Sequence, residues 1–287
     1  MQRPYSPTIR RRRLGFELRR LREEHGLTLD EAGKRSGVPR ATIGKIETAE
    51  ARRTRSRDLD ALADLYDVPP ETREALHQLS RQAKEKGWWS KYKDIFSDHA
   101  LPDFEAEASV IRTYEAQVIP GLFQTPLYAE DVFKGGRATN DPGIARRVEA
   151  RITRQSILAQ VGAPHMTAVI DEGALRRMVG SPEIMAEQLT HLENLALRHN
   201  IDLHALPFKS GSHLGMTGSF TILDFPEPRD PSLVYVGTAA DGLYLEQPHE
   251  IERYNLAFGN VQGSALSSTE SLRFIAALKA SVESEGT

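Results

Sequence analysis

Polar side chains on one predicted helix have the types and spacing that could read DNA bases. Arg40, Thr42 and Lys45 fall on its outward face, and Ile43 and Ile46 fall on its inward face. Guanidinium, ammonium and hydroxyl groups donate hydrogen bonds to base edges in the major groove, and a helix of this kind fits that groove with its N-terminal residues at the bases. The chemistry that these residues predict is recognition of double-stranded DNA.

The preceding residues predict the element that would position this helix. The segment Thr28-Leu-Asp-Glu31 is a capping box, whose reciprocal hydrogen bonds begin a helix. Ala32 and Gly33 are small enough for a second helix to cross closely, and Gly37 tolerates the positive φ of a tight turn. Residues 22–47 therefore predict a helix-turn-helix.

The charge distribution supports a role for the first residues in binding a polyanion. Residues 1–57 contain 16 Lys and Arg against seven Asp and Glu, a net charge of +9, whereas residues 58–287 have a net charge of −12. A basic segment on an acidic body is typical of a DNA-binding domain joined to a domain that does not bind DNA. The alternative is a helical bundle of unrelated purpose with a solvated charged face.

Periodicity predicts an all-α domain with about five helices, followed by an α+β domain with a small sheet packed by helices. The first helices are expected at about 9–24, 28–36, 39–48, 56–66 with Ser56 as N-cap, and 70–86. The later helices are expected at 103–116, 125–134, 141–161, 181–199, 248–263 and 267–284, and the strands at 167–170, 201–206, 218–225, 232–236 and 243–245. The predicted domains are a flexible basic arm (1–9), a helix-turn-helix domain (10–86), a sensor and dimerisation domain (88–282) with its boundary at Gly87, and a tail (283–287).

Residues 9–68 resemble the Cro/cI-type helix-turn-helix domain, the xenobiotic-response-element class of regulators. The resemblance implies particular roles. It implies base reading by Arg40, Ala41, Gly44 and Lys45, phosphate contacts from Thr28 and Leu29, and an internal ion pair between Arg22 and Glu47. The arm residues Arg10, Arg11, Arg12 and Arg13 are expected to meet phosphate or an adjacent minor groove.

The chain departs from this family's pattern at two places. Ala32-Gly33 replaces the usual Leu-Ala, which predicts a thinner core there. The Glu-x-Gly that usually closes the third helix is here Glu47-Thr-Ala49, so the path of the following loop is left open.

Residues 88–280 resemble the uncharacterised C-terminal domain of actinobacterial regulators, which include WhiJ-like and antitoxin-like proteins. The segments that carry the resemblance are Trp88–Tyr92, Tyr114–Ala129, Asp171–Arg176, Leu206–Phe208, Gly211–His213 and Gly218–Phe225. The resemblance implies a regulator of development or secondary metabolism, often encoded beside a small partner protein. It implies no ligand and no catalytic residue.

Other groupings of polar residues do not predict an enzyme, a metal or a cofactor. Ser212 and His213 are neighbours, which makes proton transfer between them geometrically awkward. The nine histidines form no zinc motif, and cysteine is absent. Asp171-Glu172 is expected to be a helix cap.

The chain also contains no apolar run of the length that a membrane span needs, and its N-terminus does not resemble a secretory signal. A cytoplasmic protein without a membrane partner is expected.

These observations predict a sequence-specific regulator, of repressor type, that binds a palindromic operator as a homodimer with half-sites about 34 Å apart. The second domain would dimerise and receive a small-molecule or partner-protein signal. A regulatory ligand site is predicted at His213, Trp88, Trp89, Tyr114 and Phe123; the alternatives are a loop that shapes the start of a strand and aromatic core residues. The alternative function is an antitoxin-like protein that restrains a small partner and regulates its own operon.

Overall fold

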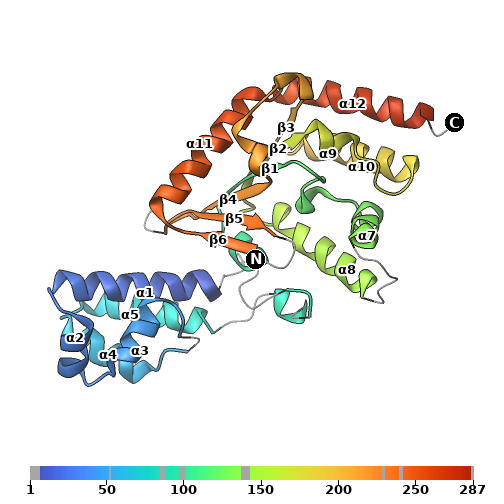
Figure 1. Cartoon of the computed structure of the whole chain (residues 1–287). Helices are drawn as coiled ribbons and strands as arrows, with labels where there is room; N and C mark the ends of the chain where they lie inside the picture. Colours follow the sequence, from blue (N-terminus) through green and yellow to red (C-terminus); the bar gives the residue numbers. More distant parts are fainter. Residues whose placement is uncertain are drawn as a thin grey trace. The chain divides into compact units, whose positions relative to one another are not determined.

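A computed structural model of the protein describes residues 7–51, 53–84, 88–92, 94–96, 101–136, 143–227, 230–238 and 242–285. The chain divides into two compact units, residues 2–107 and 108–287 (Figure 1). Each unit is described by itself. The predicted boundary at Gly87, residues 1–6 of the predicted arm and the last two residues of the predicted tail lie outside the described residues.

The first unit is helical, as predicted. Its helices are α1 (Pro7–Glu24), α2 (Leu29–Ser36), α3 (Arg40–Glu47), α4 (Ser56–Leu65), α5 (Pro70–Gln82) and the short α6 (Leu101–Glu105), with a 3₁₀ helix at Trp88–Tyr92. A single apolar core holds α1 to α5 together, and its buried members include Leu14, Leu18, Ile43, Ile46, Leu59, Leu62 and Tyr66. Burial of such side chains contributes about 1.5–3 kcal/mol each.

Three details of these helices differ from the sequence-based expectation. Helix α1 begins at Pro7 rather than Ile9, because proline is tolerated in the first turn, where its missing N–H has no partner to lose. Ser56 is the first residue of α4 and not its N-cap; Arg55 precedes the helix without a side-chain cap bond. Helix α5 ends at Gln82.

Within the described residues, the second unit contains a mixed six-stranded sheet. The strands are β1 (Val110–Glu115), β2 (His165–Asp171), β3 (Ile201–Leu206), β4 (Phe220–Asp224), β5 (Leu233–Gly237) and β6 (Gly242–Leu245), and their order is β3-β2-β1-β4-β5-β6. β1, β2 and β3 run parallel, whereas β4, β5 and β6 continue the sheet from β1 in antiparallel pairs. The predicted α+β class is confirmed.

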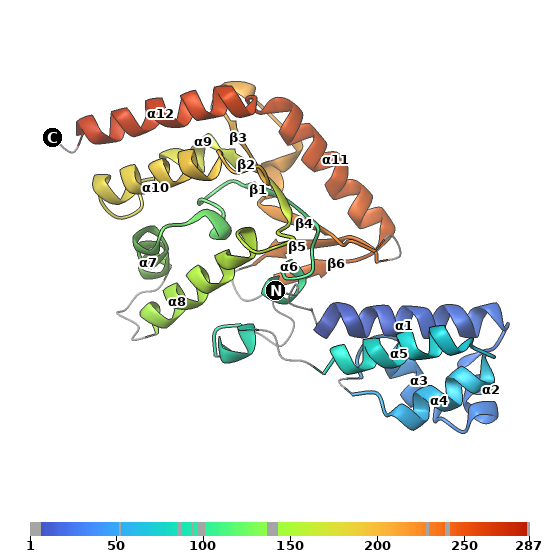
Figure 2. The same ribbon diagram turned by 180° about the vertical axis from the view of Figure 1, so that it is seen from behind.

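Helices cover the sheet on two sides. They are α7 (Pro126–Gly135), α8 (Ile144–Gln155), α9 (Glu172–Arg176), α10 (Pro182–Leu195), α11 (Pro248–Ser264) and α12 (Ser268–Glu285). Figures 1 and 2 place α11 on one side of the sheet and α7 and α8 on the other. Helix α11 contributes Ala257, Phe258 and Val261 to a core shared with Tyr114 and Phe220.

The helix predicted at 103–116 is wrong. Helix α6 ends at Glu105, and Val110–Glu115 is β1, which pairs with β2 on one side and β4 on the other. The segment Val-Ile-Arg-Thr-Tyr-Glu is rich in β-branched and aromatic residues, which fit a pleated surface that is buried on both faces.

No helix in the described parts of the chain is long and apolar enough to cross a lipid bilayer.

Candidate DNA-binding interface

The capping box at Thr28 sets the start of α2. The Thr28 hydroxyl accepts from the Glu31 amide at 3.2 Å, and the Glu31 carboxylate accepts from the Thr28 amide at 2.8 Å. The hydrogen bonds from Thr28 lower the pKa of the Glu31 carboxyl. Two amides at this end of the helix are thereby satisfied, so α2 starts at a defined residue.

The turn between α2 and α3 depends on two glycines. Gly37 has a φ of 74° and donates its N–H to the Gly33 carbonyl at 3.0 Å, which closes α2. A Cβ on Gly33 would lie 3.1 Å from the Val38 carbonyl oxygen and 3.3 Å from the Arg40 nitrogen. Ala32 is fully buried beside it. The small pair Ala32-Gly33 therefore allows the start of α3 to approach α2 closely.

Helix α3 is anchored on one side and open on the other. Ile43 and Ile46 are buried in the core. Arg40 and Lys45 are exposed. The other predicted base-reading residues share this outward surface: Ala41 is exposed, and Thr42 and Gly44 are partly exposed. Arg40 lies 3.6 Å from Asp30 with both side chains more than 60% exposed, and a pair this exposed holds the guanidinium only weakly.

The two residues implied to contact phosphate differ in exposure. Thr28 is exposed at the N-terminus of α2. Leu29 is partly buried and packs on the apolar core, and a Cβ on Gly44 would lie 4.0 Å from its side chain. Leu29 can therefore offer DNA its backbone amide, while its side chain supports α3.

The structure brings Arg22 and Glu47 together. The Arg22 guanidinium donates two hydrogen bonds to the Glu47 carboxylate, each 2.8 Å long, and a third of 2.8 Å to the Leu27 carbonyl. The side chains are only 10% and 5% exposed. Hydrogen bonding to Glu47 raises the pKa of Arg22. This bidentate pair ties the end of α1 to the end of α3.

The chain leaves α3 through a left-handed residue. Ala49 has a φ of 60°, and its N–H donates to the Ile46 carbonyl at 3.0 Å. The loop thus follows the turn that a glycine would normally form at this position, although alanine pays a steric penalty there.

The four arginines expected to meet phosphate or a minor groove, Arg10 to Arg13, lie in α1, within the predicted helix 9–24. Arg10 and Arg13 contact the buried Glu107 carboxylate at 2.6 and 3.6 Å, and both are about 15% exposed. Arg12 lies over the Phe104 ring at 5.8 Å, and Arg11 donates to Thr8 at 2.9 Å. Thr8 itself donates to the buried Asp103. The sequence could not reveal this packing, because Glu107 lies about 95 residues from Arg10 in the chain.

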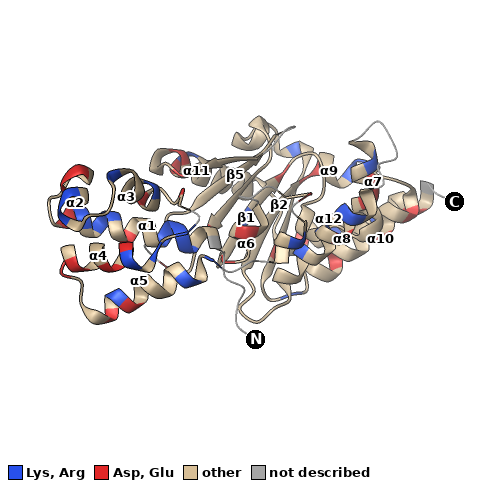
Figure 3. Ribbon diagram, turned by 90° about the horizontal axis from the view of Figure 1, so that it is seen from below, with Lys and Arg blue, Asp and Glu red and all other residues tan. Residues whose placement is uncertain are grey.

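The sequence analysis did not single out a second group of basic residues, which follows α3 in the chain. Arg53, Arg55 and Arg57 are exposed between the end of α3 and the first turn of α4. Arg57 lies 3.3 Å from Asp58, whose side chain is largely buried. Figure 3 shows further basic residues along α1 and on α2 and α3. The signal for Arg53, Arg55 and Arg57 was the run of arginines at 52–57, of which Arg52 lies outside the described residues.

The residues predicted for a ligand site divide between the two units. Trp88 and Trp89 belong to the first unit, where the Trp88 ring meets the rings of Trp89, Tyr92 and Phe96. Phe123 is fully buried in the second unit. Trp89 and Phe123 are therefore buried core residues, whereas Trp88 is half-buried.

Tyr114 and His213 do come together, at the carboxyl end of β2. Their rings meet edge to face with centroids 5.7 Å apart. The Asp171 carboxylate lies 3.3 Å from the Tyr114 hydroxyl and 3.9 Å from His213 Nε2. His213 Nδ1 is buried without a hydrogen-bond partner in the described residues.

Asp171 also accepts from the Gly173 amide at 2.8 Å, so its predicted role as a helix cap is confirmed. Within the described residues, no cluster of three or more His, Asp and Glu side chains could hold a metal ion.

Comparison with known proteins identifies both parts of the chain. The model of a helix-turn-helix domain matches residues 13–76, and that of a domain of unknown function (DUF5753) matches residues 99–277. No curated protein and no solved structure matches the chain. The helix-turn-helix match indicates a DNA-binding regulator rather than an enzyme. Because the second match covers more than half of the residues, the chain belongs to the family of proteins that carry the DUF5753 domain.

Proposed function

We propose that the protein is a sequence-specific transcription regulator of the Cro/cI type in which α3 reads bases in the major groove. The observation that carries this proposal is the outward face of α3, where Arg40 and Lys45 are exposed while Ile43 and Ile46 are buried behind them. Ala41, Thr42 and Gly44 complete the reading surface. The close approach at Gly33 holds this helix in place, and recognition needs such a fixed orientation.

Phosphate contacts would come from the two ends of the motif. The N-terminus of α2 presents the Leu29 backbone amide, a group of the kind that binds phosphate oxygens, beside the exposed Thr28. Arg53 and Arg55 follow α3 in the chain and are exposed. These contacts set the position on the duplex, while α3 supplies the sequence preference.

The role proposed for Arg10 to Arg13 depends on their release. They would reach phosphate or a minor groove only after leaving Glu107, Asp103 and Phe104. We therefore propose that Arg10 to Arg13 contribute to DNA binding only after they have left these partners. Helix α3 contributes without such a release.

The second domain would make the protein a homodimer and receive the signal. A single α3 reads too few base pairs for useful selectivity, and two-fold symmetry doubles the site. A repressor-type, WhiJ-like, cytoplasmic dimer on a palindromic operator is therefore proposed, with the loop 211–218 near its regulatory site. Sedimentation of the full chain at micromolar concentration checks the dimer.

An antitoxin-like function is the second candidate. Exposed apolar side chains on the second unit favour it: Phe208 is 63%, Leu214 is 56% and Met216 is 72% exposed. Such side chains suit a protein partner. Co-expression with a candidate small partner protein, followed by purification of a stoichiometric complex, distinguishes this function. The complex should also relieve toxicity of that protein.

Selection from a random duplex library tests the main proposal. The full chain should enrich one palindromic site with half-sites about one helical turn apart. The double variant Arg40→Ala/Lys45→Ala should enrich no site, although it still binds DNA at low salt. Recovery of the same site by this variant would contradict the assignment of α3.

A further inference from the structure

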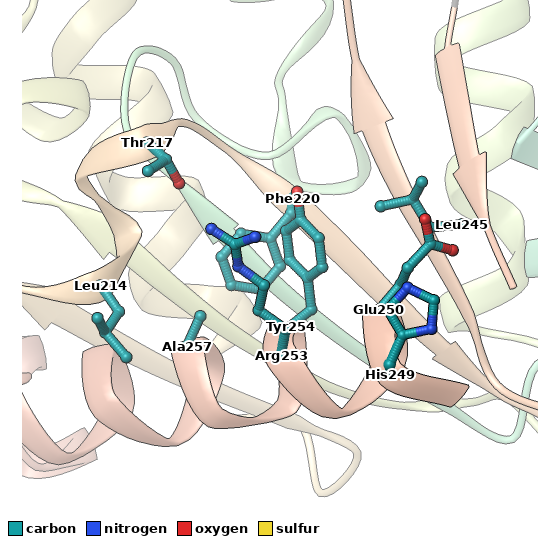
Figure 4. A pocket seen from close by; sticks show the side chains of 9 residues that line it. All are labelled: Leu214, Thr217, Phe220, Leu245, His249, Glu250, Arg253, Tyr254 and Ala257. Carbon is teal, nitrogen blue, oxygen red and sulfur yellow. The ribbon is translucent and has the colours of Figure 1, made fainter. Parts of the chain in front are cut away.

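A pocket opens on the second unit between α11 and the loop before β4. Its volume is about 440 Å³, within the range of small-molecule sites. Its lining residues come from that loop, β4, β6 and α11, and Figure 4 shows them: Leu214, Thr217, Phe220, Leu245, His249, Glu250, Arg253, Tyr254 and Ala257. None of the five residues predicted for a ligand site lines it.

The pocket has an aromatic floor. The rings of Phe220 and Tyr254 meet edge to face with centroids 5.0 Å apart. Leu214, Leu245 and Ala257 add aliphatic surface around them. This lining suits a flat, apolar body, because aromatic rings gain from stacking and edge contacts as well as from burial.

Among the residues that the structure describes, one charged side chain that lines the pocket has no partner. Arg253 projects from α11 beside Tyr254 (Figure 4) and makes no ion pair or hydrogen bond with any described residue. Glu250, which also lines the pocket, accepts from the Gln247 amide at 3.1 Å as part of the cap of α11. The Glu250 carboxylate is thus engaged at the helix start, and the Arg253 guanidinium remains available for an anion from outside.

We propose that this pocket binds a small aromatic carboxylate. The ring would lie on Phe220 and Tyr254, and the carboxylate would pair with Arg253, whose planar guanidinium suits bidentate contact. This assignment deepens the proposed regulatory function and rests on it for its biological role, although binding itself is independent of DNA.

The pocket is connected to the Tyr114–His213 pair. The Tyr114 ring packs against Phe220 at 6.0 Å and against His213 at 5.7 Å. A Cβ on Gly215 would lie 2.7 Å from the Tyr114 ring, so the loop is closely seated on this side chain. A ligand that moves Phe220 would therefore move Tyr114 and the loop, which gives the site a means of signalling.

Calorimetric titration of the full chain with 2-naphthoate and with its neutral analogue 2-naphthamide tests the proposal. We expect the acid to bind at least tenfold more tightly than the amide. Arg253→Gln should remove this difference, since it keeps a polar side chain at this position but removes the charged guanidinium. Arg273 is an exposed arginine on α12 outside the pocket, and the variant Arg273→Gln should retain the preference for the acid.

A second variant tests the volume of the site. Ala257→Leu adds bulk at the wall and should weaken both compounds at least tenfold, with melting curves used to confirm that each variant is folded. Equal affinity for acid and amide, no binding of either, or an unchanged preference in Arg253→Gln would overturn the proposal. Because no DNA is present, these results are separate from the outcome of the operator selection.

Discussion

Arg40 and Lys45 lie on the surface of α3 with little to hold them in the unbound protein. Their substitution should therefore affect recognition without affecting the fold. For Arg40→Ala and Lys45→Ala, we expect a loss of about 1–3 kcal/mol of discrimination between the selected site and random DNA for each base contact removed. Competition titrations with both DNAs measure this difference.

Arg81→Ala is the matched control for these variants. Arg81 is 60% exposed on α5, where it pairs with Glu74, and it lies outside the helix-turn-helix. It should leave discrimination unchanged. If Arg40→Ala weakened both DNAs by the same factor, Arg40 would be a phosphate ligand and not a base reader.

The Arg22–Glu47 pair should be important for the stability of the first unit. Glu47→Ala would leave a nearly buried guanidinium without its carboxylate, at a cost of up to about 3–5 kcal/mol. Thermal unfolding of the full chain, followed by circular dichroism at 222 nm, should show a lower melting temperature for the helical unit. Glu50→Ala, at an exposed neighbouring carboxylate, should leave it unaltered.

Glu115 should make stability depend on pH. Burial raises the pKa of its carboxyl to about 7 from 4.5, although a hydrogen bond with Ser219 and the charges of Arg154 and Arg151 oppose this. The folded state therefore holds more protons than the unfolded state between pH 4.5 and 7, and the free energy of unfolding falls as the pH rises through this range.

Glu115→Gln should remove this loss of stability at high pH. The variant should match the wild type at pH 4 and exceed its stability at pH 8 by up to about 3 kcal/mol, as measured by urea unfolding. Glu252→Gln, on the exposed surface of α11, controls for the change in net charge. A Glu115→Gln effect that was the same at both pH values would show that the carboxyl does not titrate in this window.

At the scale of elements, the end of α3 contains a residue under strain. Ala49 adopts a φ of 60°, which disfavours a residue with a Cβ by about 1–2 kcal/mol. Ala49→Gly should relieve this strain and stabilise the protein by about 0.5–1 kcal/mol, after the greater freedom of glycine in the unfolded chain is subtracted. The midpoint of urea unfolding measures the gain.

A second alanine-to-glycine substitution should change the stability in the opposite direction. Ala61 lies in the interior of α4, where glycine costs about 1 kcal/mol relative to alanine. Ala61→Gly should thus destabilise the same unit. Destabilisation by Ala49→Gly as well would mean that the left-handed turn is not strained.

At the scale of the whole molecule, the charge asymmetry should appear as a steep dependence of DNA affinity on salt. About six phosphate contacts predict a loss of about three decades in affinity when the salt concentration rises fourfold. Fluorescence anisotropy of the selected duplex at several salt concentrations gives the slope. Arg55→Gln should lower the slope by about one and leave discrimination unchanged.

Affinity that is indifferent to salt would exclude phosphate contacts as the main source of binding. The same titration can be made with Arg13→Gln, which tests whether α1 takes part. If Arg13 remains with Glu107 when DNA is bound, the slope should stay the same and only the melting temperature should change.

Local patterns in the chain were sufficient for the helix-turn-helix. The cap at Thr28, the turn at Gly37 and the inward Ile43 and Ile46 depend on residues within a few positions of one another, so their effect can be recognised without the fold. The α+β class of the second unit followed in the same way from runs of β-branched and aromatic residues.

Contacts between distant segments decided the rest. Strand β1 exists because Val110 pairs with His165 and with Asp224, which no local pattern at 103–116 could show. Arg10 and Arg13 pack inside the first unit because Glu107 pairs with them. The pocket combines Leu214, Phe220 and Arg253 from separate elements. Pairing, neutralisation and cavity formation are properties of groups that meet only after folding, and for this reason they were decided by the tertiary structure.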